Sequence, residues 1–188
     1  MILCDKEIND LALAGMIDPF APAQVREGII SYGLSSFGYD LRLSDDELDV
    51  YHSVEASIID AKKFDNFALW PQTLCYDGKD YWFALPPFGS ALGRSLEVLT
   101  LPDNVFAICM GKSTYARCGL IVNTTPLEPG WTGHLVIELL NTTPLPIKVY
   151  ANEGIAQLVF FRGNRPEVTY ADRKGKYQGQ RGITTAKI

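Results

Sequence analysis

Short apolar segments follow one another from Phe37 to Phe161. Pro, Gly, Asn or Asp separates them at intervals of roughly ten residues, the spacing of short strands joined by turns. This pattern predicts a mainly β fold, a barrel or a sandwich. The segments are FGYDLRL, SIIDA, FALWP, YWFALP, EVLTLP, NVFAICM, GLIVNTT, HLVIELLN, PIKVYA and IAQLVFF.

The first 16 residues predict one short helix before these strands. Asp5 is a suitable N-cap, and Asp18-Pro19 stops the helical pattern. Residues 18–36 are predicted to be a loop with a turn at 33–36. The apolar face would hold Ile8, Leu11, Leu13 and Ile17. With no internal repeat and no linker, we expect a single domain over residues 1–188.

Composition excludes several classes of protein. The 188 residues are 47% hydrophobic and carry a formal charge of −5, which argues against disorder and against duplex nucleic acid as a partner. No apolar run approaches the roughly 18 residues of a membrane span. The start, MILCDKEIND, lacks the pattern of a signal peptide. We therefore expect a cytoplasmic protein with no membrane partner.

Zinc is not expected in this chain. Its four cysteines form no CxxC pair, and it has only two histidines, His52 and His134. Neither histidine begins the H-x-E motif that zinc-dependent deaminases use.

The segment 111–119, GKSTYARCG, predicts a helical turn between two strands. It is not a P-loop, because Phe106 occupies the position of the first glycine of that motif. Ser113 is the expected cap and Gly119 the expected stop. Ser113 and Arg117 are four residues apart and share one face, which suits a phosphate, although a plain surface turn has the same pattern.

Glu138 stands in the middle of an apolar strand, HLVIELLN. Val136 and Leu140 are its neighbours on the same face. Such a carboxylate is either at the solvent edge or desolvated with a raised pKa, and a raised pKa suits a general base near neutral pH.

Two further segments are candidates for ligand contact. The turn EPGWTG, residues 128–133, is a hairpin turn or a loop that places Glu128 or Trp131 beside a ligand. Residues 170–188 carry five basic residues and one acidic residue, whereas the rest of the chain carries 12 basic and 21 acidic. Glycines at 175, 179 and 182 predict a mobile basic segment, either a frayed terminus or a lid that closes over a triphosphate.

Together and in this order, these strings resemble the deoxycytidine triphosphate (dCTP) deaminases, a branch of the trimeric deoxyuridine triphosphatase-like (dUTPase-like) superfamily. The resemblance covers nearly the whole chain. It is carried by SSFGYDLR, GKSTYARCGLIVNTTPLEPGW, GHLVIELLNTTPLP, YANEGIAQLVFF and YADRKGKYQGQRG.

The resemblance implies a distorted β-barrel of the dUTPase-like (β-clip) type with a short N-terminal helix. It implies a homotrimer with active sites between subunits. The reaction would be hydrolysis of dCTP to dUTP and ammonia, which supplies thymidylate synthesis. Mg²⁺ would be bound through the triphosphate, with no metal held by protein side chains and no zinc, and dTTP is a possible feedback inhibitor.

The resemblance also assigns roles to residues. Glu138 matches the catalytic glutamate, which would take a proton from the attacking water and return it to the leaving amine. Val136 and Ile137 match the strand whose backbone reads the cytosine edge, and residues near Thr124 and Thr125 would orient the base or the water. The remaining matches are nucleotide contacts: Lys112, Ser113, Thr114, Tyr115, Ala116, Arg117, Gln157, Tyr170, Lys176 and Gln180.

Two other functions stay open at this point. Glu128 stands where many relatives have aspartate, and an aspartate in this region activates water in the triphosphatase branch. A dUTPase, or a bifunctional enzyme that converts dCTP to dUMP and pyrophosphate, is therefore the alternative. A barrel that senses nucleotides without turnover is the third possibility. For the trimer, aromatic residues expected at the surface give additional support: Tyr76, Tyr81, Trp82, Phe83 and Phe88.

Overall fold

The computed structural model describes residues 1–53 and 58–188. The helices are α1 (Asp5–Leu13), a 3-10 turn η1 (Asn66–Ala68) and α2 (Ser113–Arg117). The strands are β1 (Ile17–Asp18), β2 (Gly33–Ser35), β3 (Gly38–Tyr51), β4 (Leu69–Pro71), β5 (Cys75–Tyr76), β6 (Tyr81–Leu85), β7 (Ser90–Thr100), β8 (Val105–Gly111), β9 (Leu120–Asn123), β10 (Thr132–Asn141), β11 (Ile147–Tyr150) and β12 (Gly154–Arg162).

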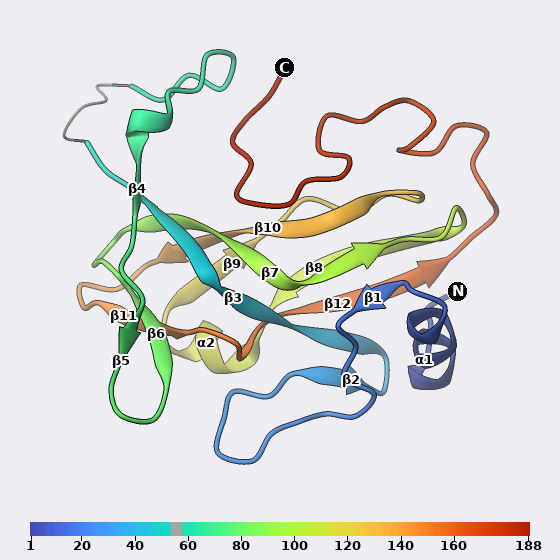
Figure 1. The fold of residues 1–188 in the computed structure, drawn as a ribbon, viewed down its shortest axis with the longest axis horizontal. Helices are drawn as coiled ribbons and strands as arrows, with labels where there is room; N and C mark the ends of the chain where they lie inside the picture. Colours follow the sequence, from blue (N-terminus) through green and yellow to red (C-terminus); the bar gives the residue numbers. More distant parts are fainter. Residues whose placement is uncertain (54–57) are drawn as a thin grey trace.

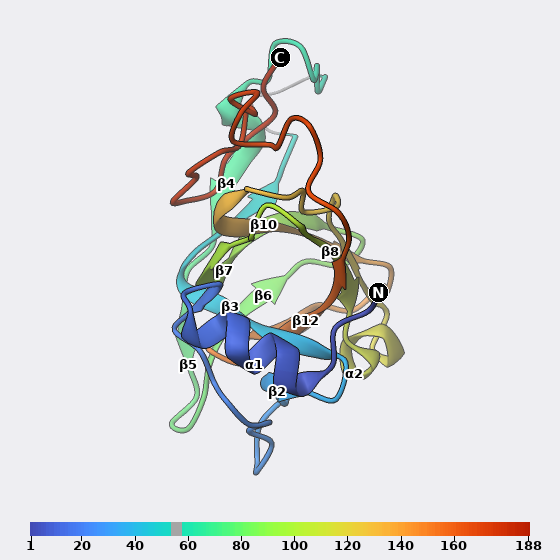
Figure 2. The ribbon, with the colours of Figure 1, turned by 90° about the vertical axis from the view of Figure 1, so that its right-hand side faces the viewer.

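Six of the strands curl into a nearly closed barrel, in the order β8-β12-β3-β7-β10-β9 (Figure 1). β8 and β9 lie at the two ends of this order and contact each other, and α2 joins them. Figure 2 looks along the barrel and shows the strands arranged around its interior. The predicted fold class, a mainly β distorted barrel with a short N-terminal helix, is confirmed.

Along each barrel strand, side chains that point into the core alternate with side chains that point outward. In β10, Leu135, Ile137 and Leu139 point inward and are buried, while Val136 and Glu138 lie on the outer face. β12 contributes the buried side chains of Leu158 and Phe160 in the same way. The sequence pattern therefore decides which face of each strand is available for a site.

Most predicted strands are present, but three predictions need correction. Residues 58–61 of SIIDA form no strand, and Ser57 lies outside the described residues. Phe67 and Ala68 of FALWP belong to η1, so only 69–71 are extended. Residues 33–35, expected as a turn, form β2, which pairs with β3. Gly33 (φ +96°) lies so close to the Ala23 carbonyl that a Cβ would clash with it.

The N-terminal helix is shorter than predicted. Its N-cap is Cys4 rather than Asp5, and the Asp5 carboxylate accepts a hydrogen bond from the Lys6 amide instead. The helix ends at Leu13, before the expected stop, and Gly15 (φ +99°) reverses the chain. Leu13 is exposed and Ile17 is in β1, so neither belongs to a helical apolar face.

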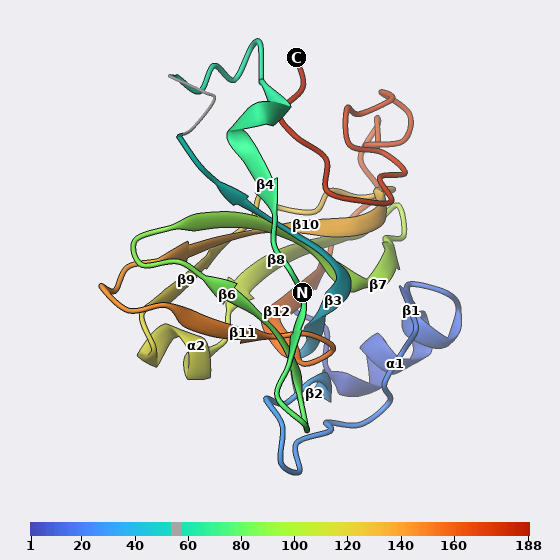
Figure 3. The same cartoon turned by 60° about the vertical axis from the view of Figure 1, so that its left-hand side comes forward.

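The C-terminal segment 170–188 lies against the outer side of the barrel, near β10 (Figure 3). Within the described residues, no helix is both long and apolar enough to cross a membrane.

Candidate active site

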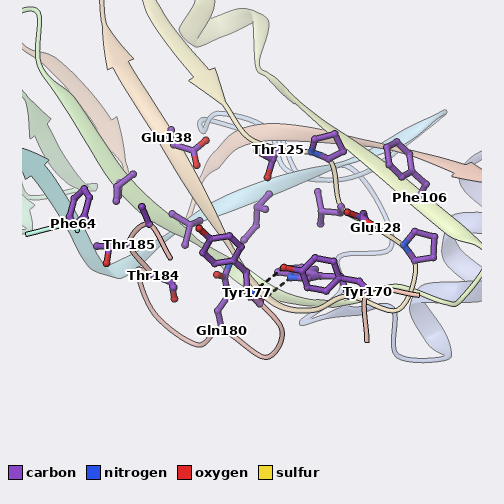
Figure 4. A pocket seen from close by; sticks show the side chains of 18 of the residues that line it. Phe64, Phe106, Thr125, Glu128, Glu138, Tyr170, Tyr177, Gln180, Thr184 and Thr185 are labelled. Atoms are coloured by element: carbon purple, nitrogen blue, oxygen red, sulfur yellow. Dashed lines mark hydrogen bonds between the residues drawn. The ribbon is translucent and has the colours of Figure 1, made fainter. Parts of the chain in front are cut away.

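A cavity of about 740 Å³ lies between the outer face of the barrel, the loop 124–131 and the C-terminal segment (Figure 4). Glu138 stands on the β10 wall, and Tyr170, Tyr177 and Gln180 come from the C-terminal segment. The other lining residues are Tyr51, Phe64, Leu92, Phe106, Thr125, Pro126, Leu127, Glu128, Pro129, Trp131, Leu135, Val136, Thr184, Thr185 and Ala186.

Glu138 is a half-buried carboxylate in a largely apolar wall. Burial raises its pKa above the usual 4.5, although its own backbone and the side chain of Asn123 oppose the shift by hydrogen bonding to the charged form. The Asn123 amide donates to the Glu138 carboxylate at 3.4 Å, across the β9–β10 pair. Burial and then the charge of Glu138 raise the pKa of Tyr51. Glu138 is thus suited to exchange protons closer to neutral pH than an ordinary glutamate.

The edge of β10 beside Glu138 is partly open. β9 pairs with β10 only from Glu138 to Asn141. The C-terminal segment pairs with the start of the same edge, where the His134 amide donates to the Gln180 carbonyl at 3.0 Å. Backbone groups two residues apart on a strand point to the same side, so the Val136 amide and carbonyl face the gap between these two partners. Ile137 is fully buried and pairs with Gly93 of β7, and it is not among the residues that line the cavity.

The loop before β10 is held rigidly at the cavity rim. Gly130 (φ +79°) packs against Thr169, where a Cβ would lie 3.1 Å from the threonine side chain. The Trp131 indole donates to the Tyr177 carbonyl at 3.0 Å, and the Glu128 carboxylate is paired with Arg173. The loop therefore brings both Glu128 and Trp131 to the cavity.

The C-terminal segment is docked across the cavity in this structure. Tyr170 donates its amide to the Pro129 carbonyl at 2.9 Å, and its hydroxyl accepts from the Tyr177 amide at 3.0 Å. The Gln180 side chain donates to the His134 carbonyl at 2.7 Å. Lys176, in contrast, is exposed, does not line the cavity, and donates to the Lys187 carbonyl.

The α2 turn lies apart from this cavity. Of the residues that the structure describes, none between Lys112 and Arg117 lines it. Lys112 is the N-cap position, so Ser113 is not the cap as predicted, whereas Gly119 (φ +81°) does end the turn. The Arg117 guanidinium donates to the Ser113 carbonyl at 3.0 Å, which places the two on one face.

Only part of the turn is exposed. The Lys112 ammonium is buried in an ion pair with Asp40 at 2.6 Å. The buried Tyr115 hydroxyl accepts from the Tyr150 amide at 2.8 Å. The residues left at the surface are Ser113, Thr114, Ala116 and Arg117. Gln157 lies on β12, where its amide donates to Ser35, and it is not among the residues lining the cavity.

The sequence patterns missed the cavity residues Tyr51 and Tyr177 and also Asn123, the hydrogen-bond partner of Glu138. Tyr51 was missed because the predicted strand stopped at Leu43, eight residues before β3 ends. Asn123 ends the apolar run LIVN and has no periodic signal of its own; its register partner Glu138 is what identifies it. Tyr177 was missed because the C-terminal segment 170–188 drew attention through its basic residues and its glycines. Among residues 1–53 and 58–188, no group of three His, Cys, Asp or Glu side chains is placed to hold a metal ion.

Comparison with known proteins places this geometry in a family. The dCTP deaminase-like family profile matches residues 2–163. The dCTP deaminases of Erythrobacter litoralis and Herpetosiphon aurantiacus are each 53% identical to this chain, over 100% of it and 99% of their own lengths.

A solved structure shows the same fold. The 2'-deoxycytidine 5'-triphosphate deaminase from Agrobacterium tumefaciens superimposes with a TM-score of 0.60 at 21% identity. The match covers 86% of this chain and 48% of that one, so this chain spans about half the length of that structure. Because the profile covers most of the chain and the relatives align from end to end, the chain belongs to the dCTP deaminase-like family.

Proposed function

We propose that this chain hydrolyses dCTP to dUTP and ammonia. The observation that carries the proposal is Glu138, a half-buried carboxylate with a raised pKa on the wall of a nucleotide-sized cavity. The relatives named dCTP deaminase share about half of all residues with this chain over its full length, which supports the same activity.

Glu138 acts as general base and then as general acid. It takes a proton from a water molecule while the water oxygen bonds to C4 of the cytosine ring, and this proton passes to N3 as the C4–N3 double bond opens. It then takes the remaining proton from the C4 hydroxyl and gives it to the 4-amino group, so that the C4–N bond to that group breaks, ammonia leaves and the C4 carbonyl forms. A raised pKa makes the Glu138 carboxylate a better proton acceptor than that of an ordinary glutamate, which favours the first proton transfer.

Positioning of the nucleotide falls to three parts of the chain. The open backbone edge at Val136 pairs with the polar edge of the base, next to Glu138. Tyr170 and Gln180 close over the cavity, and Lys176 adds positive charge from the same segment. Ser113 and Arg117 hold the phosphates, together with exposed backbone groups of the α2 turn and, from β12, Gln157.

Because α2 does not line the cavity of its own subunit, its residues can contact a nucleotide bound there only if they come from another subunit. We propose a homotrimer in which α2 of one subunit completes the cavity of its neighbour. Apolar side chains exposed on adjacent barrel strands support such contacts, and Ile121 and Leu140 are register partners. These side chains are Ile108, Met110, Ile121 and Leu140. Of the aromatics predicted at the surface, Tyr76, Tyr81 and Phe88 are exposed, but Phe83 is buried in the core and Trp82 is partly buried.

Mg²⁺ would bind through the triphosphate. The donor set fits an ion carried by the nucleotide, since Glu128, a carboxylate at the cavity rim, is already paired with Arg173. When bound, the ion neutralises phosphate charge. We further propose that dTTP, which shares the triphosphate and a pyrimidine ring, occupies the same cavity as an inhibitor, and that the enzyme works in the cytoplasm.

The alternative is a diphosphohydrolase that releases pyrophosphate, alone or after deamination. One observation favours it: Glu128 lies in the same cavity as Glu138. The ion pair with Arg173 argues against a free base at Glu128, which is why deamination alone is preferred.

The deciding experiment is an incubation with dCTP and Mg²⁺, assayed for ammonia and pyrophosphate with the nucleotide products separated. We expect ammonia and dUTP without pyrophosphate. Glu138→Gln should lower the rate by about 10²- to 10⁴-fold, and Glu128→Gln is the matched control in the same cavity. Pyrophosphate that disappears in the Glu128→Gln variant would establish the alternative. Binding of dCTP without either product would indicate a sensor.

A further inference from the structure

The C-terminal segment crosses three barrel strands within a few residues. Gln180 pairs with the edge of β10, and the Ile183 amide donates to the Glu47 carboxylate on β3 at 2.9 Å. β7 lies between β10 and β3 in the sheet. Residues 180–183 therefore run in an extended path across the outer face of the barrel. Residues on both sides of Ile183 line the cavity.

The Glu47 carboxylate is itself held in place. The Arg94 guanidinium on β7 pairs with it at 3.1 Å and also pairs with Asp46. The same guanidinium contacts the His134 ring on β10 at 3.1 Å. Arg94 is only 12% exposed and Glu47 34%, so this pair is partly desolvated, whereas Asp46 is largely exposed. Arg94, on the neighbouring strand, thus holds in place the Glu47 carboxylate that accepts the hydrogen bond from the Ile183 amide.

We propose that Glu47 and Arg94 form a latch that holds residues 180–186 over the cavity and thereby positions Gln180 beside the substrate. The inference rests on the proposed function for its effect on catalysis, but the latch itself is a property of the free chain. Glu47 is a positioning residue: it acts through the tail backbone and contributes no group to the lining of the cavity.

Backbone recognition explains why the latch suits this place. A hydrogen bond from a charged acceptor to a main-chain amide is stronger than a neutral one, and it does not depend on the side chain at position 183. Gly182 lies directly against the Glu47 carboxylate, where a Cβ would come within 3.0 Å of one oxygen. Absence of a side chain at 182 allows this close approach.

The test compares Glu47→Ala with Glu7→Ala. The two glutamates are alike in exposure, 34% and 31%, and each pairs with an arginine at about 3 Å, but Glu7 lies on α1 and pairs with Arg162. Hydrogen–deuterium exchange of the peptide that contains Ile183 is followed without nucleotide. We expect about tenfold faster exchange in Glu47→Ala, the size of losing one hydrogen bond to a charged group, and wild-type exchange in Glu7→Ala.

Kinetics with dCTP then show what the latch does. Glu47→Ala should raise KM about tenfold with a smaller change in kcat, because a loosened tail weakens binding of substrate and transition state alike. Glu47→Gln, which keeps the shape and one acceptor oxygen, should be intermediate in both measurements. Unchanged exchange at Ile183 in a folded Glu47→Ala protein would overturn the latch. Failure of the wild-type enzyme to release ammonia would overturn the proposed function, while the exchange result would still decide the latch.

Discussion

Glu138 shows what a pattern of residue types can reveal about a site and what it omits. A single carboxylate in an apolar strand predicts a desolvated acid, and burial does raise its pKa. Its partner Asn123 and its neighbour Tyr51 come from other strands, and sequence spacing along β10 has no information about them. Register across the sheet, which only the fold defines, brings the three together.

Replacing Glu138 should make the protein more stable at neutral pH. The folded-state pKa of this carboxyl lies above 4.5, so folding opposes its ionised form, and the cost appears as pH rises through and above 4.5. Glu138→Gln removes the cost. We expect a higher unfolding midpoint than wild type at pH 7.5, and a gain that shrinks towards pH 4. Thermal unfolding at both pH values checks this; an equal gain at pH 4 and pH 7.5 would contradict it.

His134 should destabilise the protein as pH falls. Burial, and then the nearby charge of Arg94, lower its pKa below 6.5, although the Ser95 carbonyl and Asp46 oppose this. The unfolded chain therefore binds the proton more readily, and stability is lost as pH drops below 6.5. Denaturant unfolding between pH 7.5 and pH 5 should show a smaller loss for His134→Gln than for wild type. Parallel curves for the two proteins would show that His134 does not contribute.

At the scale of the element, alternation predicted the strands well and their ends poorly. β3 extends to Tyr51 because Leu48 and Val50 continue its buried face, while acidic residues occupy its opposite face. The many acidic residues of SDDELD, 44–49, make this alternation hard to recognise in the sequence. SIIDA failed for the opposite reason: Ile58 and Ile59 are apolar but exposed, and composition alone cannot tell whether a segment has a partner to pack against.

The C-terminal segment pairs with β10 at Gly133, opposite Gln180. A side chain at position 133 should displace this segment. A Cβ would lie 2.8 Å from the Gln180 carbonyl oxygen, and φ is +144°. Gly133→Ala should speed hydrogen exchange of residues 177–183 and raise KM for dCTP. Gly163→Ala, where nothing lies within 4 Å, is the control. Tail protection that survives in Gly133→Ala would mean that the segment docks without this strand edge.

At the scale of the whole molecule, the separation of α2 from the cavity is the central fact. The family resemblance predicts a site shared between subunits, and nothing in the spacing of Arg117 and Glu138 along the chain could have shown that they do not meet within one subunit. The barrel itself was predictable because turn residues punctuate its strands. The residue pattern alone does not predict which surfaces meet in the proposed trimer, because exposed apolar residues such as Ile121 have the same sequence pattern as core residues.

Mixing two inactive variants should restore activity if the site is shared. Arg117→Ala and Glu138→Gln subunits, unfolded and refolded together, would form some trimers in which an intact α2 faces an intact Glu138. We expect ammonia release well above that of either variant refolded alone, and light scattering should give three times the 20.8 kDa chain mass. No recovery from a properly assembled mixture would place both residues in the same subunit's site.

The docked tail has a consequence for the speed of the enzyme. One wall of the cavity is a segment held by a few hydrogen bonds at a strand edge and by Glu47. We expect nucleotide to enter and leave past this wall, so that each catalytic cycle includes a local opening of the chain. Turnover should then slow with solvent viscosity and rise steeply with temperature, as the opening does. The rate at which the docked segment detaches is then one limit on turnover, and the chemistry at C4 is the other.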